Sequence, residues 1–117
     1  MNVEALRDYC LSKPGTTESL PFDPETLVLK VGGKMFALIS LDAQPVSVNL
    51  KCDPERAVQL RDEFSAVQPG YHMNKTHWNT VIMHPTLRWS QVQEWIDHSY
   101  DLVRKSLSKA AQAQFFE

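Results

Sequence analysis

The sequence predicts an α+β fold, a two-layer arrangement in which about five mostly antiparallel strands form a sheet with helices mainly on one face. Three observations carry this prediction. β-rich runs flank Gly32-Gly33 as in a hairpin, residues 46–51 alternate apolar with polar side chains, and residues 90–107 repeat apolar side chains at helical spacing. The predicted order of elements is α-β-β-β-α-β-β-α.

The chain begins with a helix that we expect to run from Asn2, a good N-cap residue, to about Lys13. Proline and glycine follow at once and end the helix, because proline cannot continue it and glycine favours a turn. Residues 16–25 contain two prolines and no sustained period of apolar side chains. We therefore expect a loop there, with Phe22 as its apolar anchor.

The next three predicted strands form the centre of the sheet. Residues 26–31 and 34–41 flank the two glycines, and a two-residue turn would place Leu29 opposite Phe36. Both strands are apolar on both faces, which predicts a central position. In residues 46–51 Val and Leu alternate with polar side chains, and this pattern predicts one buried and one solvated face.

A second helix starts at Asp53 and Pro54, which supply an N-cap carboxylate and a proline at the first helical position. Two short strands follow, at about residues 66–73 and 78–83. Since both are bounded by turn residues, we expect them to pair with each other and complete the sheet.

The longest predicted helix begins at Ser90, where the sequence Ser-Gln-Val-Gln fits a capping box. Its apolar face extends to Leu107 and should cover the sheet. Residues 108–117 are a weakly ordered tail that could add a short helical stretch. We treat residues 1–117 as a single domain, because a chain of 117 residues can bury its own core.

Composition excludes several classes of protein. The first residues carry charge instead of the basic and apolar regions of a signal peptide, and no run reaches ~18 apolar residues. We therefore expect a cytoplasmic protein with no membrane segment. A net charge of −2 argues against a strong, delocalised nucleic-acid binder, which would usually be basic.

The residues with reactive side chains do not form a recognisable catalytic or metal-binding pattern. Cys10 and Cys52 match no metal or redox spacing, so we expect free thiols in a reducing compartment. A helix start could lower the pKa of Cys52, but no feature places a histidine beside it. His72 and His77 could approach each other across a turn, yet a third metal ligand is not specified. We expect no enzyme activity, no metal and no cofactor.

Short motifs in a particular order point to a family. They are Pro21-Phe22-Asp23, residues 30–37 around the glycine pair, residues 50–55, Gly70-Tyr71-His72-Met73-Asn74-Lys75, His77-Trp78-Asn79-Thr80-Val81 and residues 99–103. In this combination the sequence resembles the MmcQ/YjbR family over nearly the whole chain. The resemblance implies a small bacterial domain with a frataxin-like (CyaY-like) or secretion-chaperone-like arrangement, described as a double-wing DNA-binding protein. It implies no catalytic residues.

Binding of double-stranded DNA would need cations that meet phosphates, and donors or aromatic rings that meet bases. Because the chain offers few such cations, we expect weak, mainly electrostatic contact through a sheet and hairpin surface. The candidate residues are Lys30, Lys34, Lys51, Lys75 and His77 for phosphates, and Tyr71, Asn74 and Asn79 for bases.

The competing hypothesis is a protein-interaction or chaperone-like module that uses an open face of the sheet. The two hypotheses differ in where the lysines should lie. Lysines gathered on one positive face would favour DNA, whereas dispersed lysines around an open apolar patch would favour a protein partner. The sequence does not indicate an oligomeric state.

Overall fold

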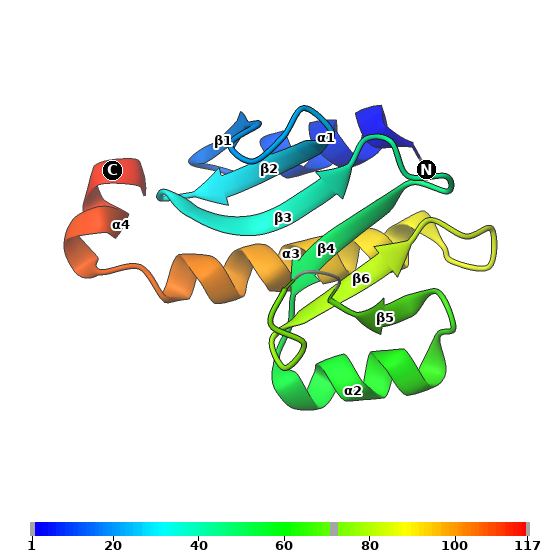
Figure 1. The fold of residues 1–117 in the computed structure, drawn as a ribbon. Coiled ribbons are helices and arrows are strands. Elements are labelled where there is room, and N and C mark those ends of the chain that lie inside the picture. The colour runs from blue at the N-terminus through cyan, green and yellow to red at the C-terminus, as the bar shows by residue number, and fades with distance from the viewer. Residues whose placement is uncertain (1, 71–72, 117) are drawn as a thin grey trace.

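A computed structural model describes residues 2–70 and 73–116 and confirms the predicted α+β class. Six strands form one open sheet in the spatial order β1-β2-β3-β4-β6-β5, and each neighbouring pair is antiparallel. Helix α3 runs behind the sheet with α1 beside it, and α2 lies next to β5 (Figure 1). The elements are α1 (Val3–Leu11), β1 (Thr16–Ser19), β2 (Thr26–Val31), β3 (Lys34–Ser40), β4 (Ser47–Lys51), α2 (Pro54–Glu63), β5 (Val67–Pro69), β6 (Trp78–Ile82), α3 (Trp89–Lys105) and α4 (Lys109–Phe116).

Strand β1 corrects the expectation that residues 16–25 form only a loop. It pairs with β2 at the edge of the sheet. From this strand Glu18 accepts two hydrogen bonds of 2.6 Å from Arg7 on α1. The strand has no period of two in its sequence because most of its side chains are exposed, so burial imposes no alternation of apolar and polar residues.

The β2–β3 hairpin turns at Gly32 and Gly33 as predicted, with φ values of +58° and +81°. The predicted pair of Leu29 with Phe36 is wrong, because a β-bulge adds one residue to β3 and places Leu29 opposite Ala37. Phe36 and Ala37 are neighbours, yet both are fully buried in the helix-covered core. A regular strand would have directed one of them to the opposite face.

The main core lies between the sheet and α3. This helix buries Val92, Trp95, Ile96, Ser99, Tyr100 and Val103. The set follows the predicted helical spacing with two differences. Tyr100 joins the buried face, and Leu102, which the periodicity assigned to it, is only half-buried. The ring of Tyr100 meets the ring of Phe36 edge-on, with centroids 5.4 Å apart. Contacts of this kind fix the position of α3 over β3.

Ser99 is a fully buried polar side chain in the middle of that helix face. Its hydroxyl donates a 2.5 Å hydrogen bond to the Phe36 carbonyl on β3 and accepts a 2.9 Å bond from the backbone N–H of Lys51 on β4. Regular pairing of these strands ends at Ala37 and Leu50. Ser99 therefore satisfies two backbone groups at the point where the bulge interrupts the ladder.

Two of the three predicted helix starts are confirmed. Asn2 and Asp53 each accept a hydrogen bond from a backbone N–H in the first turn, so they cap α1 and α2 as predicted. The capping box of α3 begins at Arg88 instead of Ser90, and Gln91 accepts a 2.9 Å bond from the Arg88 backbone N–H. The sequence allows two capping boxes, Arg88 with Gln91 and Ser90 with Gln93. Serine is the better N-cap residue, which is why the pattern pointed to the second box, but the first one forms.

Lys109–Phe116 form helix α4, which is the short helical stretch that the sequence allowed in the tail. After α3, Leu107 is buried, and α4 lies just beyond the turn of the β2–β3 hairpin (Figure 1). Within residues 2–70 and 73–116, no helix combines the length and the apolar composition needed to cross a bilayer.

The bond pattern of Ser99 predicts a large effect of Ser99→Ala. Removing the hydroxyl leaves a buried carbonyl and an N–H unsatisfied, at a cost of ~1–3 kcal/mol each, so the free energy of unfolding should fall by about 3 kcal/mol. Ser106→Ala is the matched control, because its hydroxyl bonds only within the end of α3. Urea unfolding of the variants measures the difference, and equal losses would contradict this assignment.

Candidate functional site

The face of the sheet opposite the helices, which we call the open face, has no covering helix among the described elements (Figure 1). Strand register assigns its side chains, because directly paired residues of antiparallel strands point to the same side of the sheet. They include Thr26, Val28 and Lys30 of β2, Met35, Leu38 and Ser40 of β3, Ser47, Asn49 and Lys51 of β4, and Trp78 and Thr80 of β6.

A hollow of about 330 Å³ lies on the open face, and we call it the apolar hollow because the large apolar side chains of Phe22, Met35, Leu38 and Met73 line it. Phe22, in the loop between β1 and β2, forms part of its rim and is 64% exposed. A large exposed aromatic ring beside an apolar hollow is typical of a contact surface. The hollow is lined by Phe22, Asp23, Thr26, Met35, Leu38, Ser40, Asn49 and Met73. Beneath it is an apolar cluster of Val28, Leu38 and Trp78, with Met35 and Met73 packed against it.

A polar hollow of about 310 Å³ adjoins the apolar hollow, and Ser40 and Asn49 line both. Within residues 2–70 and 73–116, the polar side chains that line it carry hydroxyl and amide groups, and none of the lining side chains is ionised. Within it, Asn49 Oδ1 accepts a 2.6 Å hydrogen bond from Thr80 Oγ1. The polar hollow is lined by Ser40, Ala43, Gln44, Pro45, Ser47, Asn49, Gln68, Pro69, Thr80 and Ile82.

The loop that carries Met73 is held close to the sheet. The backbone N–H of Gly70 donates a 2.8 Å hydrogen bond to the carbonyl of Trp78, and a Cβ at Gly70 would lie 2.7 Å from the Cβ of Trp78. Only glycine permits this approach. Further along, Asn74 Oδ1 accepts a 2.9 Å bond from the backbone N–H of Thr76, so the Asn74 side chain shapes the turn.

The predicted DNA-contact lysines lie on different parts of the surface. Lys30 and Lys51 are on the open face, on the strands that flank β3, roughly 10 Å apart across the sheet. Lys34 pairs with the last residue of β2, and this register directs it to the helix-covered side. Lys75 lies in the loop before β6, where its carbonyl accepts a 2.9 Å bond from Arg61 on α2. No ion pair within residues 2–70 and 73–116 uses any of the four.

The remaining residues predicted to contact DNA also lie in different places. Asn74 and His77 are exposed in the loop. Asn79 is 2% exposed and donates a 3.3 Å hydrogen bond to the Ala57 carbonyl, so it belongs to the helix-covered interior and is not offered to DNA. Tyr71 lies outside the described residues.

Sequence reasoning missed most of the residues that form the apolar hollow. Phe22 was expected to anchor its loop, but its ring is exposed because the loop stands at the rim. Met35 and Leu38 did carry a signal, since β3 is apolar on both faces. Met73 carried none, because it reaches the hollow only through the path of its loop.

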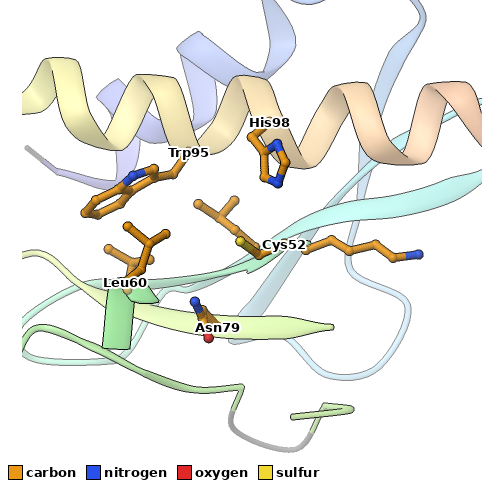
Figure 2. A pocket seen from close by; sticks show the side chains of 8 residues that line it. Cys52, Leu60, Asn79, Trp95 and His98 are labelled. Atoms are coloured by element: carbon orange, nitrogen blue, oxygen red, sulfur yellow. The ribbon is translucent and has the colours of Figure 1, made fainter. Parts of the chain in front are cut away.

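A small cavity of about 10 Å³ lies on the helix-covered side. In Figure 2 the side chains of Cys52, Leu60, Asn79, Trp95 and His98 surround it, from β6, α2, α3 and the end of β4. Asn79 Oδ1 is buried there without a hydrogen-bond partner in the part of the chain described. The volume admits nothing larger than about one water molecule, so the cavity is not a ligand site.

The titratable groups of the interior are held in their neutral forms. Burial raises the pKa of the Cys52 thiol, and it raises that of Cys10 to about 12, so both are poor nucleophiles at neutral pH. His98 Nε2 accepts a 3.2 Å bond from the backbone N–H of Asp53, and burial together with the charge of Arg56 lowers the pKa of His98. Among residues 2–70 and 73–116, no three His, Cys, Asp or Glu side chains gather as a metal site.

Comparison with known proteins places this fold beside a set of bacterial proteins. A family model described as YjbR matches residues 11–102. Protein YjbR of Escherichia coli K12 is 37% identical over 100 residues, which cover 86% of this chain and 85% of that protein. Protein YbdF of Escherichia coli O157:H7 is 34% identical over 109 residues, covering 93% and 89%.

Two solved structures share the arrangement of helices and strands. The crystal structure of protein DR2400 of Deinococcus radiodurans has a TM-score of 0.91 and 39% identity, and the match covers 97% of this chain and 86% of that one. A crystal structure of a protein from Pseudomonas syringae has a TM-score of 0.77 and 27% identity, over 88% and 99% of the two chains.

The environment of His98 predicts a proton affinity below the ordinary histidine value. Its pKa should lie below ~6.5, because burial disfavours the charged ring and protonation adds a cation near Arg56. Protonation also removes the acceptor for the backbone N–H of Asp53. Since the unfolded chain then binds the proton more readily, the free energy of unfolding should fall as pH drops below ~6.5. His98→Gln should remove part of that fall. NMR titration of the ring measures the pKa, and a value at or above ~6.5 would refute the assignment.

Proposed function

This chain belongs to the YjbR family, and from that premise we propose that it is a binding module that holds a segment of a partner protein on its open face. The observation that carries the proposal is the apolar hollow with Phe22, 64% exposed, at its rim. Exposed apolar surface is unfavourable in water. A partner side chain that fills the hollow would bury this surface, with a favourable free energy of ~25 cal/mol per Å² buried. The hollow is therefore suited to an apolar anchor residue.

The charges around the apolar hollow favour an acidic partner. Lys30 pairs across the sheet with Met35 and Lys51 pairs with Trp78, so both lysines lie next to the apolar cluster beneath the hollow, outside the set of residues that line it. Asp23 lines the hollow and keeps its negative charge, although its carboxylate is turned toward its own loop by a 2.9 Å bond from the backbone N–H of Glu25. The two lysines and Asp23 together leave one net positive charge around the hollow. A segment with an apolar residue flanked by Asp or Glu would fill the hollow and meet both lysines.

We also propose that the protein acts by binding alone and catalyses no reaction. The raised pKa values of Cys10 and Cys52 support this, because a protonated thiol is a weak nucleophile. The polar side chains that line the polar hollow carry hydroxyls and amides, which suit hydrogen bonding to a ligand.

A peptide array tests the partner chemistry. The array carries 12-residue peptides with one Leu, Met or Phe flanked by Asp or Glu, and matched peptides in which Lys replaces each acidic residue. The protein should retain the acidic peptides preferentially. The Lys30→Glu/Lys51→Glu double variant should lose roughly tenfold in affinity for them, because attraction becomes repulsion at two positions next to the apolar cluster.

Lys34→Glu is the matched control, since its lysine points by register to the other side of the sheet, and it should bind as the unchanged protein does. Equal retention of acidic and basic peptides would overturn the proposal. So would a double variant that binds no differently from the control.

Double-stranded DNA is the second candidate partner. The observation that favours it is that Lys30 and Lys51 share one face and form no ion pair within residues 2–70 and 73–116. Two phosphate contacts imply weak binding with little sequence preference. Apolar surface lies between these lysines, and for that reason we rank DNA below a protein segment.

The DNA candidate is tested by fluorescence anisotropy of a short labelled duplex at about 20 mM salt, where counterion release favours binding most. Two phosphate contacts give a slope of about −2 in log affinity against log salt. Lys30→Glu and Lys51→Glu should each weaken binding across sequences, while Lys34→Glu should not. A flat titration with protein in the high micromolar range would eliminate DNA as a partner.

A further inference from the structure

Asn49 occupies the centre of the open face. It lies in β4, between β3 and β6, at the point where the apolar and polar hollows meet. Asparagine is disfavoured in the middle of a strand, and this residue is only 9% exposed. Its neighbours along the strand, Val48 and Leu50, are ordinary core residues. The stability of the sheet alone does not explain an amide at this position.

The orientation of the Asn49 amide is fixed by one hydrogen bond. Oδ1 accepts a 2.6 Å bond from Thr80 Oγ1 on the adjacent strand. That bond turns the Nδ2 group, which carries two N–H donors, toward the remaining space of the two hollows. Within residues 2–70 and 73–116, no hydrogen bond uses these donors, and Nδ2 is not among the sealed polar atoms without a partner. A donor in this position is available to a ligand.

We propose that Asn49 Nδ2 donates to a main-chain carbonyl of the bound segment, an inference that rests on the proposed function. The acceptor is neutral, because the described residues that line the polar hollow supply hydroxyls and amides and no cation. The segment's apolar side chain fills the apolar hollow beside Asn49. The next residue then lies over the polar hollow, near Ser47 and Gln68.

The strand spacing orients the segment. Lys51 is two residues from Asn49 on the same face, which is roughly 7 Å and close to the distance between alternate residues of an extended peptide. An acidic residue therefore meets the lysine on one side of the anchor, and an uncharged residue follows on the other. The recognised pattern is acidic, then apolar, then neutral.

The closing experiment uses the acidic peptide that the array retains best, together with a series of analogues in which one backbone amide at a time is replaced by an ester. An ester weakens its carbonyl as an acceptor and leaves the side chains unchanged. One ester position should reduce the affinity of the unchanged protein about fivefold, the value of one ordinary hydrogen bond. Asn49→Ala should cause a similar loss, and in this variant the same ester should have no further effect.

The outcomes separate this inference from the proposed function. If the acidic peptide binds but no ester position weakens it, the segment is held without Asn49 and the inference fails alone. That result does not depend on whether Asn49→Ala folds, because it is read on the unchanged protein. Additive losses from the ester and from Asn49→Ala would also overturn the inference. If no acidic peptide binds, both fail.

Discussion

The hydrogen bond from the Ser99 hydroxyl to the carbonyl of Phe36 is the constraint on which the rest of the structure depends, because it supplies a partner to a backbone group at the bulge in β3. The bulge sets which side of the sheet each residue of that strand faces. With it, Phe36 and Ala37 both enter the helix-covered core, while Met35 and Leu38 both remain on the open face. Regular alternation could not place apolar side chains in this way.

The open face follows from that arrangement and from two loops beside it. Gly70 lets its loop approach Trp78 closely, which brings Met73 against the apolar cluster. Phe22 stands at the opposite rim with most of its ring in water. Val28 is completely buried on this face, and the two adjoining hollows beside it remain open. Large apolar side chains line one hollow, and hydroxyl and amide groups line much of the other.

The fold could largely be predicted from the sequence, because local signals agree with burial where an element is half-buried. The glycine pair marked the hairpin, and the periodicity of α3 identified its inner face apart from Tyr100 and Leu102. The bulge left no local pattern in the sequence. The carbonyl of Phe36 at the bulge is satisfied by Ser99, which lies 63 residues further along the chain. The site was less predictable for the same reason: Met73 and Phe22 come together through loop paths, and Asn49 read as a solvated strand position although it is buried.

The location of binding is tested most directly by NMR of the methionine methyl groups, because the described methionines lie on both sides of the sheet. Met35 and Met73 pack under the open face, whereas Met83 is buried in the helix-covered core. The protein with 13C-labelled methionine methyls would be titrated with the acidic peptide retained by the array. Binding on the open face should shift the methyl signals of Met35 and Met73 and leave the Met83 signal unchanged. A shift confined to Met83, or no change at Met35 and Met73 at saturation, would contradict binding on that face.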